Sequence, residues 1–317
     1  ISTVLIAILL GILMGNAFTP RPGMMIGLDF TQQYILKLGI IFLGIRLSFA
    51  DFIKFGSIAI PLIIICIVGV LILIKLLIKK VPISSKMSYL IAIGTSVCGA
   101  TAIVATAPVI NAKKSEVAYA IANITLFGVI AMLLYPYFAE WYFDNQSLNV
   151  GLFLGTSIHE TSQVAAAGLI YDQQFNSPET LNVATVTKLI RNTFLVILIP
   201  LFAFLYNRGE FKGQKYSIFN IFPYFVLGFI GMIIVRNLGD QLYPTGSNNH
   251  EIWVNLIEYL KILATVFLTM AMAAVGISIN LSELKSMGYK PFVVGLIAAV
   301  TVGIISLIYI ETLQKFI

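Results

Sequence analysis

The chain has 317 residues, of which 59% are hydrophobic and only 11% are charged, and its mean hydropathy is +0.95. Soluble domains carry roughly 25% charged residues, so a soluble fold could not bury this much apolar surface. The net charge of +6 comes from lysines and arginines that gather in a few short loops, a pattern that reports membrane orientation and not nucleic-acid binding. The composition predicts a single transmembrane unit over residues 1–317, surrounded by lipid and without a nucleic-acid partner.

The first apolar run and the two cysteines exclude other classes. Residues 1–15 have no basic flank and no small-residue cleavage site, which favours a membrane span whose beginning is trimmed over a cleaved signal peptide. Cys66 and Cys98 lie inside apolar stretches, so we expect neither a disulfide framework nor a cysteine-based zinc site.

Ten apolar runs are bounded by charged residues, Pro, Gly or Asn, and each is long enough for a helix. They fall near residues 1–15, 31–49, 57–78, 87–110, 116–138, 149–171, 183–206, 219–236, 259–279 and 291–310. In hydrocarbon an isolated segment satisfies its backbone only as a helix, and the runs lack the alternation of barrel strands. The predicted fold class is all-α integral membrane, with about ten crossings of the bilayer.

Two of these runs are rich in small residues and resemble each other. Residues 94–108 read GTSVCGATAIVATAP, and residues 155–168 read GTSIHETSQVAAAG. Small residues let helices pack closely, which is one interpretation. The other, which we favour, is that both runs are interrupted near mid-membrane, because Gly lowers helix stability and Thr-Ser readily caps a new half-helix.

The loop charges distinguish two forms of interruption. Four lysines lie between residues 75 and 86, and Lys113 and Lys114 follow the first interrupted run, whereas residues 139–149 and 171–183 contain no Lys or Arg. Because Lys and Arg collect in the cytoplasm, this pattern favours two re-entrant hairpins, one entering from each side, over broken helices that cross fully. Either form would resemble the inverted repeats of transporters.

His159 and Glu160 lie within the second interrupted run, at a depth where ionisable groups are costly and face protein or water. One interpretation makes them a structural pair with the hydroxyls of Thr156 and Ser162. The other makes them substrate ligands or proton-coupling groups, since the ordinary pKa of imidazole is near neutrality.

Polar residues also follow one face of the run at 183–206. Arg191 lies too deep in this run to be an end residue, while Lys188 could extend its ammonium toward the near surface. Arg191 either forms a buried ion pair with Glu160 or neutralises a substrate anion together with Lys188. The stripe consists of Asn182, Thr185, Lys188, Arg191 and Asn192.

An anion site would need backbone donors as well as positive charge. We expect half-helix N-termini at Thr95 and Ser96, and at Thr156 and Ser157, to supply N–H groups to the substrate. Asn123, near the middle of its span, is interpreted as a hydrogen-bonding contact between helices in preference to a ligand.

Enzymatic motifs are absent from the sequence. His159 and Glu160 begin an H-E-x-x-H pattern, but position 163 is Gln, so the second histidine of this zinc motif is absent. Neither interrupted run contains a full G-x-S-x-G motif. We therefore predict no catalytic residue, no cofactor and no metal site. Gly11 and Gly15, four residues apart, fit either a homodimer face or internal packing.

Several motifs together resemble the sulfate exporter family of YeiH-like bacterial inner-membrane proteins. They are GTSVCGATAIVATAPVI (94–110), GTSIHETSQVAAAG (155–168), TKLIRNTFLVILIP (187–200), LGIRLSF (43–49) and AMAAVGISI (271–279). The resemblance implies a ten- or eleven-helix fold related to the cation/proton antiporter and anion transporter group, with inverted repeats, in the cytoplasmic membrane. It indicates the charge and size of a substrate such as sulfate or a sulfonate.

These observations predict a secondary active transporter of a small anion that works by alternating access. Two other readings stay open at this point. In one, Glu160 and exposed carbonyls hold Na⁺, so that the coupling ion is Na⁺ instead of H⁺ and another solute is carried. In the other, the protein is a channel or a sensor without active transport.

Overall fold

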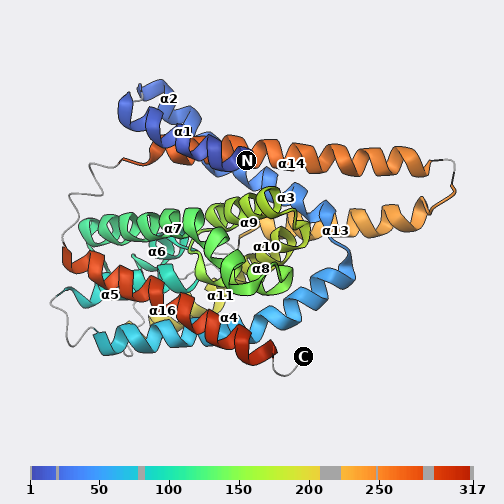
Figure 1. Ribbon diagram of the computed structural model, residues 1–317. Helices are drawn as coiled ribbons and strands as arrows, with labels where there is room; N and C mark the ends of the chain where they lie inside the picture. The colour runs from blue at the N-terminus through green and yellow to red at the C-terminus, as the bar shows by residue number, and fades with distance from the viewer. Residues whose placement is uncertain are drawn as a thin grey trace.

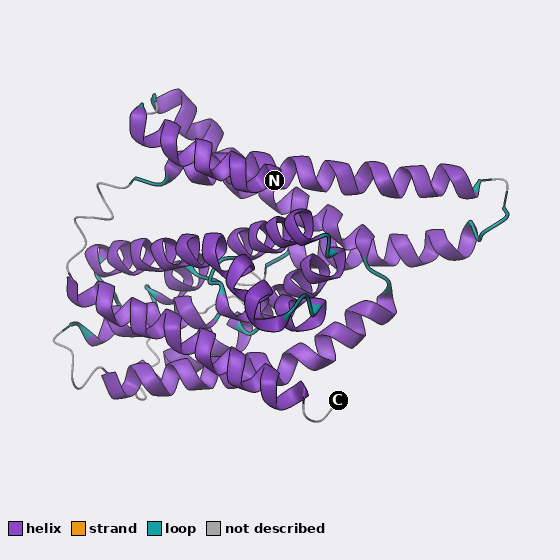
Figure 2. Cartoon of the chain, viewed as in Figure 1, coloured by secondary structure: helices purple, strands orange, loops and turns teal. Residues whose placement is uncertain are grey.

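The computed structural model describes residues 2–18, 21–77, 83–207, 223–247, 249–280 and 289–314. Within these ranges the protein is helical throughout and contains no strand, which confirms the predicted all-α class (Figures 1 and 2). The elements are α1 (Thr3–Ala17), α2 (Pro22–Phe30), the π-helical η1 (Thr31–Ile35), α3 (Leu36–Leu43), the 3-10 turn η2 (Gly44–Arg46), α4 (Phe49–Leu77), α5 (Ser85–Ser96), α6 (Ala100–Thr106), α7 (Lys114–Phe143), α8 (Ser147–Ser157), α9 (Thr161–Phe175), α10 (Pro178–Thr193), α11 (Leu195–Asn207), α13 (Phe225–Leu242), α14 (His250–Ser278) and α16 (Tyr289–Gln314).

Seven helical stretches in the described ranges are long and apolar enough to cross a membrane, and α1 is a shorter apolar helix. Two of the ten predicted runs instead form short helix pairs, α5 with α6 and α8 with α9. Residues 1, 78 and 219–222 of the predicted runs lie outside the described residues. The estimate of about ten full crossings is therefore reduced, and the run predicted at 31–49 begins earlier, at Pro22.

The helical stretch Pro22–Arg46 includes polar residues, and one of them has partners on a neighbouring helix. Gln32 donates from its amide nitrogen to the Ser278 hydroxyl at 2.7 Å and to the Ala274 carbonyl at 3.2 Å, both on α14. A polar side chain that is satisfied by a neighbouring helix does not end a membrane span. The hydrophobicity pattern alone could not show this pairing.

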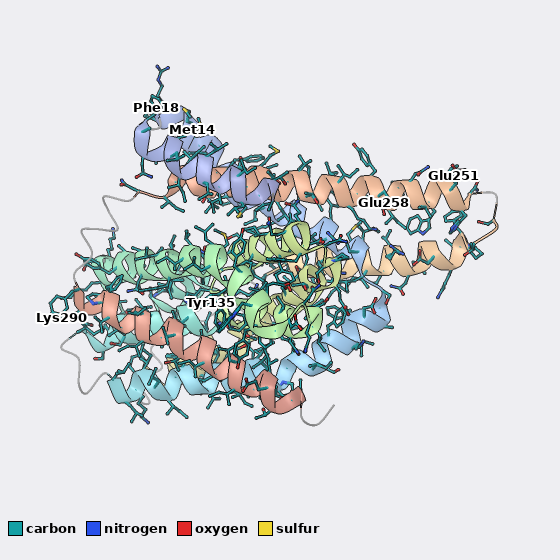
Figure 3. The ribbon with its side chains drawn as sticks, in the orientation of Figure 1. Met14, Phe18, Tyr135, Glu251, Glu258 and Lys290 are labelled. Carbon is teal, nitrogen blue, oxygen red and sulfur yellow. The ribbon has the colours of Figure 1, made fainter. Side chains whose placement is uncertain are left out.

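The outer surface is apolar and the interior contains the polar groups. Leu13, Leu134 and Ile262 are 60–66% exposed, and Met14 lies at the outer edge of the molecule while Tyr135 lies among packed helices (Figure 3). Buried polar side chains gather instead on α8, α9 and α10. An apolar surface around a polar interior is the arrangement that a bilayer requires.

The helices form two groups. In one, α14 packs against α1 and α3, and α13 packs against α3; the other contains α4 to α11 with α16, and α9 contacts α1 and α14 of the first group (Figure 1). A Cβ at Gly11 would lie 2.5 Å from the Ala273 carbonyl oxygen, and one at Gly15 only 2.1 Å from that of Ile277. These glycines therefore serve the internal packing of α1 on α14, the second of the two predicted uses.

The helices α8 and α9 run in opposite directions. The Ser147 hydroxyl, at the start of α8, lies 2.8 Å from the Ser177 hydroxyl just beyond the end of α9. Because α8 ends at Ser157 and α9 begins at Thr161, the chain reverses within three residues. We call residues 156–160 the second tip.

The helices α5 and α6 form a similar antiparallel pair. Lys86, near the start of α5, donates to the Asn111 carbonyl beyond the end of α6 at 2.7 Å. A Cβ at Gly94 would lie 2.9 Å from the Ile103 side chain, so the two helices are close at their junction. We call residues 95–99 the first tip.

Helix α7 separates the open ends of the two pairs. It begins just after α6, ends just before α8, and has 30 residues, which corresponds to a length of about 45 Å. Near its middle, Ile124 lies against Gly99 of the first tip and Gly128 lies against Gln163 next to the second. The two pairs thus open at opposite ends of α7 and meet near its centre.

The predicted interruptions are confirmed, but their predicted polarity is wrong. Thr95 and Ser96 end α5, and Thr156 and Ser157 end α8, so none of them begins a half-helix. The Thr156 hydroxyl bonds back to the Leu152 carbonyl at 2.7 Å, which is how a hydroxyl inside a helix is satisfied. The tips therefore present helix C-termini where the sequence suggested N-termini.

Close packing of α8 on α10 is predicted to depend on Gly155. A Cβ there would lie 2.6 Å from Cβ of Thr187 and 2.9 Å from the Ala184 carbonyl oxygen, so we expect Gly155→Ala to lower the free energy of unfolding by about 1–3 kcal/mol. Gly231→Ala is the matched control because nothing lies within 4 Å of its Cβ, and alanine is preferred in helices by roughly 0.5–1 kcal/mol. Thermal unfolding in detergent compares them; equal melting temperatures would contradict this packing.

Candidate functional site

The guanidinium of Arg191 joins the two tips. Its side chain is fully buried on α10, as the sequence predicted, and it donates only to backbone carbonyls. The acceptors on the first tip are Ser96 (2.7 Å from Nε) and Thr95 (bonded to Nη2), and those on the second are Thr156 (2.6 Å from Nη1) and Ile158 (3.2 Å from Nη1).

The ammonium of Lys188, one turn earlier on α10, does the same. Its Nζ donates to Val97 of the first tip at 2.8 Å, to Ile158 of the second at 3.1 Å, and to the His159 carbonyl. Three carbonyl acceptors match the three N–H groups of a charged ammonium. Lys188 is fully buried and does not extend to the surface.

These contacts have a common electrostatic purpose. The last carbonyls of a helix lack intrahelical donors, and each C-terminus carries roughly half a negative charge. The ends of α5 and α8 meet around Lys188 and Arg191, which satisfy carbonyls from both and offset their charge. Without these two cations the tips would repel each other in a medium with little water.

The alternative partner of Arg191, an ion pair with Glu160, does not form. Among the described residues the ion pairs are Arg46 with Asp172, Arg236 with Asp240 and Lys261 with Glu258. The carbonyl cluster takes the guanidinium instead, because it offers acceptors from two helix ends at once.

Glu160 lies at the start of the two outgoing helices. Its carboxylate accepts from the backbone of Gln163 in a capping box for α9, and Gln163 Oε1 accepts from the Glu160 N–H at 3.2 Å. Its Oε1 also accepts a long hydrogen bond of 3.4 Å from the Ala100 N–H at the start of α6. Negative charge is favourable at helix N-termini, so Glu160 is the counterpart of Lys188 and Arg191.

Gly99 makes the contact between Glu160 and the first tip. Its φ is +64°, a conformation that glycine adopts without steric cost. A Cβ at this position would lie 2.4 Å from Cγ of Glu160. Both the turn and the approach of the carboxylate therefore require glycine here.

Several buried polar groups around the tips have no hydrogen-bond partner among the described residues. Both ring nitrogens of His159 are unpaired although the residue is 1% exposed. Folded proteins leave few buried polar groups unpaired, so these groups mark a place suited to a polar ligand. The other unpaired atoms are the hydroxyls of Thr95, Ser96, Ser157 and Thr187, Asn192 Oδ1 and Gln163 Nε2.

The proposed structural pairing of His159 with Thr156 is not observed. The Thr156 hydroxyl is bonded within α8 and lies 2.7 Å from the Ser306 hydroxyl of α16. Of the predicted site residues, Lys188, Arg191, Glu160 and His159 come together at the tips, with Thr95, Ser96 and Ser157, while Thr156 contributes its carbonyl and a link to α16.

The sequence interpretation missed three residues of the site. Gln163 was used only to exclude a zinc motif, although it occupies the position of α9 where a capping box has Glu or Gln. Gly99 had no signal beyond a glycine-rich run, and Ser306 had none. Asn123 is correctly interpreted as a contact between helices, since its amide donates to the Pro291 carbonyl at 2.6 Å.

Arg191 is predicted to matter first for stability. In Arg191→Ala, carbonyls of two helix ends lose their donor, at a cost of roughly 1–3 kcal/mol for each buried acceptor left unpaired. Arg191→Lys keeps the charge but not the fork geometry, so its loss should be intermediate. Arg236→Ala, which breaks a partly exposed pair with Asp240 and a long 3.3 Å hydrogen bond to the Ile45 carbonyl, should cost less, about 1 kcal/mol. Chemical unfolding in detergent ranks the three; an Arg191→Ala protein as stable as Arg236→Ala would contradict the role assigned to the carbonyl contacts.

Comparison with known proteins gives the family. The family described as Conserved hypothetical protein 698 matches residues 1–295. The chain is 35% identical to the UPF0324 membrane protein SAG1125 of Streptococcus agalactiae over 303 residues, 94% of this chain and 86% of that protein. It is 34% identical to the UPF0324 membrane protein FN0533 of Fusobacterium nucleatum over 306 residues, 95% and 88% of the two chains.

A third relative, the UPF0324 inner membrane protein YeiH of Escherichia coli, is 32% identical over 305 residues, 93% of this chain and 81% of that protein. No solved structure matches the chain. The resemblance to YeiH-like proteins and the predicted location are confirmed. The chain belongs to the Conserved hypothetical protein 698 (UPF0324) family and is a multi-pass protein of the bacterial inner membrane.

Proposed function

We propose that this protein is a secondary active transporter of a small anion that works by alternating access around the two tips. The observation that carries the proposal is the group of unpaired, buried polar side chains beside two buried cations, where helix pairs from opposite ends meet. Polar groups without partners need a ligand that supplies them. Transporters commonly place substrate at such breaks in their helices, near the bilayer midplane.

The two helix pairs are proposed to be re-entrant hairpins related as an inverted repeat. The pair α5–α6 opens beside Lys86, Lys113 and Lys114, which supports a cytoplasmic location for its open end. The pair α8–α9 opens beside Ser147 and Ser177 at the other end of α7. Each tip would then be reached from one side of the membrane, as alternating access requires.

The cations supply charge to this site while other groups supply direct bonds. The three N–H groups of Lys188 donate to carbonyls. Lys188 therefore attracts a substrate anion electrostatically but has no further N–H to donate to it. The hydroxyls of Ser96 and Ser157 and an N–H of His159 have no acceptor among the described residues and can donate to an anion. An oxyanion such as sulfate or a sulfonate offers several acceptors to such donors. Glu160 carries the negative charge at the tips and is the proposed proton carrier, with His159 as a second candidate.

The Na⁺ alternative has less support. The carbonyls that a Na⁺ site would need at the tips accept from Lys188 and Arg191. A channel or a sensor is a separate alternative, and accumulation of substrate against its gradient would exclude both.

Removal of unpaired hydroxyls should separate binding from folding. Because the hydroxyls of Ser96 and Ser157 have no hydrogen-bond partner in the described part of the chain, Ser96→Ala and Ser157→Ala should leave stability nearly unchanged, within about 0.5 kcal/mol. Each substitution should raise the sulfate concentration that gives half-maximal counterflow by roughly tenfold, which corresponds to about 1.4 kcal/mol for one lost hydrogen bond.

Thr106→Ala is the control, since Thr106 is also buried and unpaired but lies at the far end of α6. An unchanged half-saturating sulfate concentration in both serine variants would exclude the tips as the binding site. Absence of saturable counterflow for sulfate and other small anions by folded protein would remove the transport proposal.

The hairpin arrangement predicts opposite accessibility for two engineered cysteines. Ser115, at the start of α7, and Gln174, near the end of α9, are exposed at opposite ends. A membrane-impermeant maleimide should label Gln174→Cys in intact spheroplasts and label Ser115→Cys only after permeabilisation. The unsubstituted protein is the background control because Cys66 and Cys98 are buried. Labelling of both cysteines from the same side would refute the hairpin topology.

A further inference from the structure

The charged groups at the tips do not balance. Lys188 and Arg191 contribute two positive charges, and Glu160 contributes one negative charge, so one positive charge remains. Three carbonyl acceptors around Lys188 Nζ match a charged ammonium, and the two backbone N–H groups that donate to the Glu160 side chain favour its ionised form. The partial charges of two helix C-termini and two N-termini cancel one another.

Other charged residues on the neighbouring helices are remote from this group or already bonded. The titratable groups whose charges act on Glu160 are Lys188 of α10 and the Cys98 thiol of the first tip, while His159 of the second tip interacts with Lys188 and Arg191. The acidic residues of α7 and α14 in the described ranges have partners or lie at helix ends. These are Glu116 with Ser84, Glu140 with Tyr171, Glu258 with Lys261, and Glu251 at the start of α14.

A buried surplus charge is costly unless a ligand neutralises it. We infer that the anion bound at the tips cancels this single positive charge: a singly charged anion binds alone, and a doubly charged anion binds together with one proton held by Glu160. This inference rests on the site of the proposed function and adds the charge and the proton count of its substrate. The only covalent change is the transfer of one proton from solvent to a Glu160 carboxylate oxygen.

The geometry around Glu160 is compatible with this proton. When protonated, the carboxyl gains an O–H donor and loses the negative charge that holds it at the Ala100 N–H, where the hydrogen bond is already long at 3.4 Å. The capping box with Gln163 keeps the side chain at the start of α9. A doubly charged anion then meets a site with two positive charges and no competing carboxylate.

Sulfate and methanesulfonate form a matched pair for testing this inference, because they have similar shapes and differ by one charge. Their binding to the purified full chain is measured by titration calorimetry in two buffers of different ionisation enthalpy at the same pH, which gives the protons taken up per anion bound. We expect one proton with sulfate and none with methanesulfonate. In Glu160→Gln, the proton uptake with sulfate should be lost, and in the control Glu258→Gln, which removes an exposed carboxylate, it should remain.

Equal proton uptake with both anions, uptake that persists in Glu160→Gln, or no binding of either anion would overturn the inference. The comparison of the two anions in the unsubstituted protein stands even where Glu160→Gln does not fold. Counterflow in proteoliposomes separates this inference from the proposed function. Binding with the expected proton count but without counterflow would refute transport and leave the inference about charge and proton count intact. Counterflow of both anions with equal proton movement would refute only that inference.

Discussion

Four helix ends meet inside this protein, and the rest of the fold depends on how their charges are cancelled. The C-termini of α5 and α8 share Lys188 and Arg191 as donors, and Glu160 lies at the starts of α6 and α9. Free backbone groups at the centre of a membrane protein are costly. The interrupted helices are therefore stable only while α10 presents its two cations to both tips.

The same requirement fixes the packing around α10. Lys188 and Arg191 are three residues apart and point to one face of the helix, and Gly155 lets α8 approach that helix closely enough for its last carbonyls to be reached. On the same stripe of α10, Asn192 donates to the Thr161 hydroxyl at 2.9 Å and connects α10 to the first residue of α9. The two cations that stabilise the tips are thereby buried near hydroxyls that have no partner among the described residues, which is the basis of the proposed anion site.

The sequence predicted much of this arrangement for clear physical reasons. Apolar runs of about 20 residues have few alternatives to helices in a bilayer, and a cation at the depth of Arg191 must face protein. Lys188, which the sequence allowed to extend to the near surface, is fully buried instead. The lysines near residues 86 and 113 indicated that the first interrupted run returns to its own side. Antiparallel packing of α5 with α6 agrees with that expectation.

What failed was the polarity of the tips. Gly-Thr-Ser can end one helix or begin the next, and only the tertiary contacts of the carbonyls at Ser96 and Thr156 with Arg191 show that it ends one. The partners of Arg191 could not be predicted for the same reason. They are backbone carbonyls, which every residue has, so no residue type in the sequence identifies them. The capping role of Glu160 had only a weak signal, because Gln163 has the residue type of a capping box but Glu is not one of its usual N-cap residues.

The most direct test of the central claim is the position of a bound anion. Selenate has the charge and shape of sulfate, and its selenium can be located by anomalous diffraction from crystals of the purified protein. We expect an anomalous peak between the two tips, within hydrogen-bonding reach of the hydroxyls of Ser96 and Ser157 and of the His159 ring. A peak confined to other parts of the protein, with the tips empty at saturating selenate, would contradict the claim that these unpaired groups and buried cations form an anion site.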